Sequence, residues 1–102
     1  MKTISRLPVA QLRASDEHVE AFKALAHPGR LEVFFTLVKG RREMAAGEVQ
    51  EAVGMPSPTV SHHLDQLRRA GLIQARRQER YIYYSVGTPM VTDLVRLLTA
   101  CC

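Results

Sequence analysis

The only two cysteines of this 102-residue chain are adjacent, at Cys101 and Cys102. Thiolates are soft ligands, so a cysteine pair can bind a soft metal or metalloid ion. Neighbouring side chains on a regular helix diverge by about 100°, so both thiols can contact one atom only if the last helical turn unwinds. Such a pair cannot form a disulfide framework. The plainer interpretation is two free thiols without a role.

The segment 55–71, MPSPTVSHHLDQLRRAG, is the second candidate for chemistry. Ser57 before Pro58 predicts a capped helix start, and Gly71 predicts the end of that helix. One face carries the apolar residues Val60, Leu64 and Leu67. The opposite face carries polar side chains that are short at its start, which suits a helix entering a DNA major groove. An ordinary amphipathic surface helix is the alternative.

The residues expected to reach DNA lie on this helix and on the arginine-rich segment after it. On the helix they are Ser57, Thr59, Ser61, His62, His63 and Gln66. On the following segment they are Arg76, Arg77 and Arg80. Hydroxyl, imidazole and amide groups can hydrogen-bond base edges, whereas arginines beside the groove mainly contact phosphates or a narrow minor groove. For His63, on the flank of the apolar stripe, a histidine at the rim of the core is the alternative. A metal site shared by His62 and His63 is not expected, because adjacent helix positions diverge.

Three helices must precede this segment to position it. Ser15 predicts a helix start, and Pro28 ends that helix because proline disfavours helix in the residue before it. Its predicted apolar face is Val19, Phe22, Leu25 and Ala26. A second helix is predicted over 28–38, where Leu31, Phe34, Phe35 and Val38 give the strongest core signal of the chain. After a connector at 41–45, a third helix covers 46–53, with Val49, Ala52 and Val53 inward.

The period changes after Gly71. Segments 72–78 and 81–86 are rich in β-forming residues and predict a hairpin, whose turn around Gln78, Glu79 and Arg80 lacks glycine. Thr88 and Pro89 then predict the start of a last helix. Its apolar stripe is Met90, Val91, Leu94, Val95, Leu97 and Leu98. So broad a stripe suggests burial against another chain, with docking on its own core as the alternative. Four helices, a hairpin and a helix make a mainly α winged helix-turn-helix, expected to be homodimeric.

Length and composition agree with one globular domain over residues 1–102. The net charge is +4, and 46% of the residues are hydrophobic. No apolar run approaches the roughly 18 residues that span a bilayer, and no signal peptide opens the chain, so we expect a cytoplasmic protein without a membrane partner. Residues 56–84 contain five arginines and only two acidic residues. This basic balance favours nucleic acid, although a solvated charged face is the alternative.

Three segments resemble the ArsR/SmtB family of small bacterial metal- and metalloid-responsive repressors. FKALAHPGRLEVFFTL (22–37) is similar to the opening helices of that family, with Ala26, Arg30 and Leu31 at the positions of its recurrent motif. TVSHHLDQLRRAGLI (59–73) is similar to its recognition helix, and QERYIYYSV (78–86) to its wing. The resemblance implies a homodimer joined by its first and last helices, bound to palindromic double-stranded operator DNA and released by an inducer.

Two sensor sites of that family are missing from this sequence. Ala45, Ala46 and Gly47 stand where many members carry a Cys-x-Cys metalloid site. The zinc-binding Asp/His set of the last helix is also absent, since all four histidines lie elsewhere. A subset of the family senses arsenite through a cysteine pair at the end of the last helix, which is where Cys101 and Cys102 lie. The resemblance therefore implies arsenite, antimonite or methylarsenite as inducer, with the source of any third ligand open and no permanent cofactor.

Three other functions compete with a metalloid-responsive repressor. A thiol redox sensor of the same fold would oxidise Cys101 and Cys102 instead of binding a metalloid. A regulator without any ligand would leave both thiols without a role. A small thiol enzyme is disfavoured, because the cysteines are not in a Cys-x-x-Cys helix start that lowers a thiol pKa, and no acid–base constellation accompanies them. We therefore expect no enzymatic activity.

Overall fold

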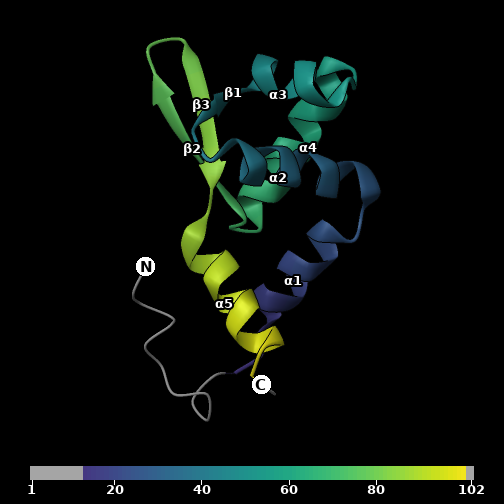
Figure 1. Cartoon of the computed structure of the whole chain (residues 1–102), viewed down its shortest axis with the longest axis vertical. Coiled ribbons are helices and arrows are strands. Elements are labelled where there is room, and N and C mark those ends of the chain that lie inside the picture. Colours follow the sequence, from purple (N-terminus) through teal and green to yellow (C-terminus); the bar gives the residue numbers. More distant parts are fainter. Residues whose placement is uncertain (1–12, 101–102) are drawn as a thin grey trace.

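The computed structural model describes residues 13–100. It contains the helices α1 (Asp16–Leu25), α2 (Pro28–Gly40), α3 (Ala46–Val53), α4 (Ser57–Arg69) and α5 (Thr88–Leu98). Its strands are β1 (Met44–Ala45), β2 (Ile73–Gln78) and β3 (Tyr81–Val86). Figure 1 shows α1 and α5 together at the end of the molecule away from α3 and the tip of the β2–β3 hairpin. The predicted winged helix-turn-helix is confirmed.

The sheet has the strand order β1-β3-β2 and is antiparallel throughout. Pairing of Gln78 with Tyr81 leaves Glu79 and Arg80 as a two-residue turn, and Glu79 takes the left-handed conformation (φ 58°) without being a glycine. The prediction of a plain connector over 41–45 is wrong, because Met44 pairs with Tyr84 and Ala45 with Tyr83. A two-residue strand is too short to produce a recognisable alternation in sequence.

The first two helices begin as their sequences predict. Ser15 caps α1 by accepting the backbone N–H of His18, and the Ser15 N–H donates to His18 Nδ1 at 3.0 Å. Pro28 starts α2, whose N-cap is His27. The predicted end of α2 is two residues too early, because Gly40 is helical and Arg41 takes the left-handed position (φ 56°).

The predicted caps of α4 and α5 are off by one residue. Ser57 and Thr88 are the first helical residues, Pro56 and Gly87 precede them, and neither helix has a side-chain cap. The sequence could not resolve this, because the first four N–H groups of a helix are all free and proline fits the second position as well as the first. Gly71, by contrast, ends α4 in the expected left-handed conformation (φ 80°).

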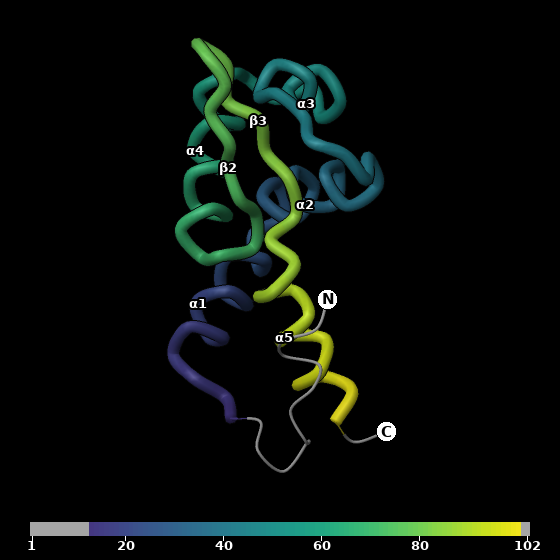
Figure 2. Tube along the Cα trace, turned by 90° about the vertical axis from the view of Figure 1, so that its left-hand side faces the viewer, coloured from purple at the N-terminus to yellow at the C-terminus, as the bar shows by residue number. Residues whose placement is uncertain are grey.

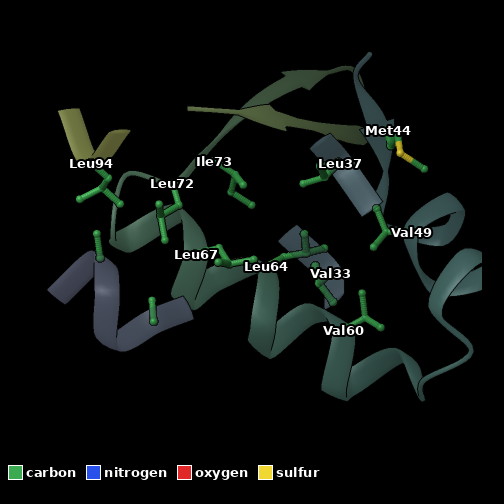
Figure 3. Packing of buried hydrophobic residues seen from close by; sticks show 12 residues of the cluster. Val33, Leu37, Met44, Val49, Val60, Leu64, Leu67, Leu72, Ile73 and Leu94 are labelled. Carbon is green, nitrogen blue, oxygen red and sulfur yellow. The ribbon is translucent and has the colours of Figure 1, made fainter. Parts of the chain in front are cut away.

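The buried core gathers around the apolar stripe of α4. Val60, Leu64 and Leu67 are each at most 1% exposed and lie between α2, β2 and α3, as Figure 3 shows. Leu72 and Ile73 extend this core past the end of α4, where Leu72 N–H donates to the Leu67 carbonyl at 3.0 Å. This 6→1 bond satisfies a terminal carbonyl of α4. The recognition-type helix is thus fixed along its inner face.

Several apolar residues that the periodicity assigned to the core are on the surface instead. On α2, Leu31, Phe35 and Val38 are exposed, whereas Val33 and Leu37 are buried. On α1, Val19 and Phe22 are exposed, and the helix buries Ala21 and Ala24. On α3, Ala52 is exposed beside the buried Val49. These helices have a second apolar face, and periodicity cannot tell a core face from an outward one.

Helix α5 divides its broad apolar stripe between two directions. Leu94 is 5% exposed and belongs to the core of its own chain, whereas Val95 and Leu98 are 53% and 65% exposed. Docking on its own core therefore holds for Leu94, and burial of Val95 and Leu98 against another chain stays a prediction. The helix leaves the sheet at Gly87, whose N–H donates to the Leu72 carbonyl at 2.8 Å, and Figure 2 shows the chain turning there from β3 into α5.

Candidate nucleic-acid interface

Helix α4 exposes polar side chains away from its buried stripe. Ser57, Thr59, Ser61 and His62 are exposed, and Gln66 is partly buried. Within residues 13–100 the three hydroxyl side chains have no hydrogen-bond partner. Short side chains let a helix approach a groove closely, and free hydroxyls can bond to phosphates or base edges.

His63 lies on the inner side of α4 and is only 4% exposed. Its expected contact with DNA is therefore contradicted, and the alternative of a histidine at the rim of the core agrees with the structure. Its ring lies 4.9 Å from the ring of His27, centroid to centroid, and its Nε2 faces Gly29 at the start of α2. A methyl group on Gly29 would come within 3.0 Å of that nitrogen.

The environment of His63 favours its neutral form. Burial, followed by the charges of His27, Arg30 and His62, lowers the pKa of His63 below its usual value. His63 Nδ1 is buried and has no hydrogen-bond partner among the described residues. His63 therefore acts as a neutral spacer between α4 and α2.

The β2–β3 hairpin is the wing of this fold, and its three arginines are not equivalent. Arg76 forms two hydrogen bonds with Glu43, from Nε to Oε2 at 2.8 Å and from Nη2 to Oε1 at 2.7 Å. Its third donor, Nη1, binds Gln78 Oε1 at 2.8 Å. Arg77 and Arg80 are exposed and form no ion pair within residues 13–100. Only these two wing arginines carry a charge free for a phosphate.

The Glu43–Arg76 pair fixes the middle of β2 to the residue directly before β1. The hydrogen bonds from Arg76 hold the pKa of Glu43 below its usual value, and Glu43 in turn raises the pKa of Arg76. The Arg76 guanidinium also lies 5.2 Å from the centre of the Tyr83 ring on β3. The pair cancels one positive charge and positions the strand that carries Arg77.

The end of α4 carries its own compensated charges. Asp65 accepts hydrogen bonds from Arg68 Nη2 at 3.0 Å and Arg69 Nε at 2.9 Å, one helical turn away. The hydrogen bond from Arg68 is the largest of the effects that lower the pKa of Asp65. One carboxylate is thus shared by two arginines, which leaves a net positive charge at the end of α4.

Helices α1 and α5 are joined by a hydrogen bond between His18 and Asp93. His18 Nε2 lies 2.6 Å from Asp93 Oδ2, and both side chains are largely buried. Because His18 Nδ1 accepts the Ser15 N–H, Nε2 must carry the proton and donate to the carboxylate. The bond ties the cap of α1 to the middle of α5.

Sequence reasoning missed the roles of Glu43, His18 and Asp93. The Ser15–His18 spacing is that of a capping box with histidine in place of glutamate, so it was a usable signal for His18. No local pattern marks Glu43 or Asp93, because their partners lie 33 and 75 residues away.

Cys101 and Cys102 lie outside the described residues. Within residues 13–100, no three histidine, cysteine, aspartate or glutamate side chains lie together so as to hold a metal ion. None of the helices in this range has the length and apolar character needed to cross a membrane.

Known proteins similar to this chain include repressors. A family profile described as a helix-turn-helix domain matches residues 25–74, which contain α2, α3 and α4. The biofilm growth-associated repressor of Xylella fastidiosa is 34% identical over 86 residues, which cover 84% of this chain and 74% of the relative. The probable mercury resistance operon repressor of Streptomyces lividans is 42% identical over 82 residues, or 80% of this chain and 64% of that protein.

A solved structure shares the fold of this chain over most of its length. The homodimeric winged helix-turn-helix DNA-binding domain Mb0332 of Mycobacterium bovis, a possible ArsR-family transcriptional regulator, superposes with a TM-score of 0.67 at 29% identity. The match covers 83% of this chain and 79% of that one. The likeness therefore covers most of the winged helix-turn-helix fold.

Proposed function

This chain belongs to the ArsR family of winged helix-turn-helix transcriptional regulators, and on that premise we propose that it is a homodimeric repressor released from its operator by a trivalent arsenic or antimony species at Cys101 and Cys102. The proposal has three parts: binding to DNA, dimerisation, and release. Each part rests on a different region of the molecule.

The observation that carries DNA binding is the joint exposure of the polar face of α4 and the free wing arginines. Ser57, Thr59 and Ser61 have no competing partners within the described range, and Arg77 and Arg80 have uncompensated charges. A helix in the major groove and a cationic hairpin along the backbone together account for both kinds of group. Gln66 and His62 are then the side chains that read bases, because they lie seven and three residues after Thr59 and share its face of the helix.

Dimerisation is supported by the outward apolar faces of α1 and α5. Val19 and Phe22 on α1 and Val95 and Leu98 on α5 are large apolar side chains exposed at one end of the molecule. Burial of such groups against a second copy would be favourable. Two copies would also provide two recognition helices, and a palindromic operator needs them about one DNA turn apart.

Release is assigned to the cysteine pair, which follows Leu98 by only three residues. Thiolates favour soft ions, and a similar protein is named as a probable mercury resistance operon repressor. Two protein thiolates match methylarsenite, or arsenite completed by an outside thiol. Binding that re-forms the end of α5 would disturb the adjacent dimer contacts, and DNA must then weaken inducer binding by the same factor.

The test is a fluorescence-anisotropy titration of operator DNA with and without a panel of metals and metalloids, in the presence of reductant. We expect arsenite, antimonite or methylarsenite to release the DNA from the wild-type protein. Cys101→Ser and Cys102→Ser should each abolish release and leave operator affinity unchanged, and Thr99→Ala serves as a control on the same segment. Arsenite-induced release that persists in the double cysteine variant would contradict the site.

The same titration separates the competing functions. A thiol redox sensor has the same two cysteines, but it would release DNA after oxidation and not with arsenite under reducing conditions. A regulator without a ligand would keep its DNA under every condition of the panel. Either outcome would replace the metalloid proposal and leave the DNA-binding part intact.

A further inference from the structure

A cleft of about 320 Å³ lies between α1, α2 and the end of α4. Its polar lining consists of Glu20, Lys23, Arg30, Gln66 and Arg69. We propose that this cleft binds a phosphate group through Lys23, Arg30 and Arg69, and that the group comes from the DNA backbone or from a free phosphoester. The volume lies at the lower end of the range of small-molecule sites, roughly 300–1,000 Å³, and the lining is polar where such sites are usually apolar.

Three cations from three different elements line the cleft. Lys23 comes from α1, Arg30 from α2 and Arg69 from α4, whereas Glu20 is the only acidic residue in the lining. Glu20 Oε2 is 3.6 Å from Lys23 Nζ, a long contact between two exposed side chains that contributes little. The lining therefore keeps a positive balance, which is the requirement for an oxyanion.

Arg69 also retains a charge for the cleft. Its Nε binds Asp65 at 2.9 Å, but the same carboxylate accepts a hydrogen bond from Arg68. Since one negative charge is shared by two guanidinium groups, the pair of arginines is undercompensated. Arg68 does not line the cleft, so Arg69 is the member of this undercompensated pair that faces it.

Arg30 is the fixed member of the set. It is partly buried, and its Nη1 donates to the Ala24 carbonyl at 3.4 Å. Its Nε is fully buried and has no partner among the described residues. A guanidinium held in this way loses little conformational entropy when it binds an anion, and its planar fork matches phosphate oxygens.

The cleft is continuous with the proposed DNA surface through Gln66. This residue lines the cleft and also belongs to the polar face of α4. A phosphate in the cleft would therefore lie beside operator DNA and would connect α1, a proposed dimer helix, to α4. Assignment of the bound phosphate to DNA rests on the proposed function, whereas binding of a free phosphoester is independent of it.

The first experiment uses the full-length protein without DNA, so that it is independent of the proposed function. Inorganic phosphate is titrated into ¹⁵N-labelled protein at constant ionic strength, and amide shifts are followed by NMR. We expect saturable shifts confined to residues near Lys23, Arg30 and Gln66. Lys23→Ala and Arg69→Ala should each weaken binding roughly threefold to tenfold, the loss of one charge-assisted contact at an exposed site.

Lys39→Ala is the matched control, because it removes an exposed lysine at the far end of α2 and leaves the cleft lining unchanged. It should bind phosphate as the wild type does. Shifts spread over all cationic residues, or an equal loss in the control, would overturn the proposal.

The second experiment identifies the source by the salt dependence of DNA binding. If the phosphate belongs to DNA, Lys23→Ala and Arg69→Ala each lower the slope of log affinity against log salt by about one contact, and Lys39→Ala does not. Localised phosphate binding with an unchanged slope assigns the cleft to a free phosphoester. A fall in slope without binding of inorganic phosphate still assigns the cleft to a DNA phosphate. If neither the fall in slope nor phosphate binding is observed, the proposed site is wrong.

Discussion

The two ends of the molecule expose opposite kinds of side chain. Around α4 and the wing, the surface carries hydroxyl groups, an imidazole and free arginines such as Arg77. Around α1 and α5, it carries large apolar groups, of which Phe22 and Leu98 are examples. Both ends are stabilised by the same core, because α4 and α5 each direct one face inward.

This contrast shows which feature of a helix determines its role. Every helix of the chain needs one apolar face for folding, so that face says little about function. The second face of α4 is polar and suits a charged partner, whereas the second face of α5 is apolar and suits another protein surface. The difference predicts that substitutions on the outer faces change binding, whereas substitutions on the inner faces change stability.

The largest effect is expected at the apolar end, where Val95 and Leu98 are replaced together by glutamate. Two charges in the proposed dimer contact would have to be buried without partners, so we expect a monomer and complete loss of operator binding. The fold of the single chain should be retained, because both positions are exposed in it. Analytical ultracentrifugation measures the first result and circular dichroism the second.

Leu94 provides the matched comparison on the opposite face of α5. Leu94→Ala should lower the free energy of unfolding by about 2–3 kcal/mol, because it leaves a cavity between α5 and the core. Leu94→Glu would unfold the chain and is no test of dimerisation. If the Val95/Leu98 variant remained a dimer, the apolar end would lose its proposed role.

A smaller effect is expected from His63, which belongs to the inner face of α4. Since burial lowers its pKa, the unfolded chain takes up a proton first as the pH falls below its ordinary value of about 6.5. The stability that the neutral ring contributes is therefore present above that pH and is lost as the pH falls through the folded-state pKa. His63→Leu should flatten the loss of stability between about pH 6.5 and 4.5, as measured by urea unfolding at several pH values.

The stability that Glu43 contributes is lost in a lower pH range than the stability that His63 contributes. The pKa of Glu43 is lowered from 4.5, so the stability that it contributes is lost only below that value. His63→Leu and the wild type should therefore lose stability in parallel at lower pH. An unchanged slope between pH 6.5 and 4.5 in the variant would show that His63 does not titrate in this environment.

The smallest effect distinguishes the arginines of the wing. Arg77→Ala should weaken binding to all DNA sequences and lower the salt slope by about one, because its charge is free. The double substitution Glu43→Ala/Arg76→Ala removes a compensated pair, so its slope should stay near the wild-type value. Both slopes are measured by anisotropy over a salt series. Equal slopes for the two variants would show that the Glu43–Arg76 ion pair separates when DNA binds.

The sequence predicted the elements with a local chemical cause. Pro28 marks a helix start as expected, the third helix has its predicted bounds of 46–53, and Gly71 takes the left-handed conformation that its position requires. The apolar stripe of α4 is fully buried, as the spacing of Val60 and Leu64 predicts. Each of these features depends on residues within one or two helical turns.

Features that depend on distant partners were not predictable in the same way. Phe35 was assigned to the core because its spacing is that of a buried face, but only the packing of Val33 and Leu37 decides which face turns inward. The burial of His63 depends on the space above Gly29, and the pairing of Arg76 depends on β1. The polar surface of α4 was therefore foreseen largely correctly, and the charge balance of the wing was not.

The junction of α4 and α5 restricts how this sequence can evolve. A side chain on Gly87 would place its first carbon 2.3 Å from the Gly71 carbonyl oxygen, so no side chain fits at Gly87 without a shift of the backbone. Gly71 itself has a left-handed conformation that other residues rarely adopt. Descendants of this chain can alter the polar side of α4 and the apolar end independently, but Gly71 and Gly87 between them tolerate few replacements, so both surfaces must adapt around a fixed connection.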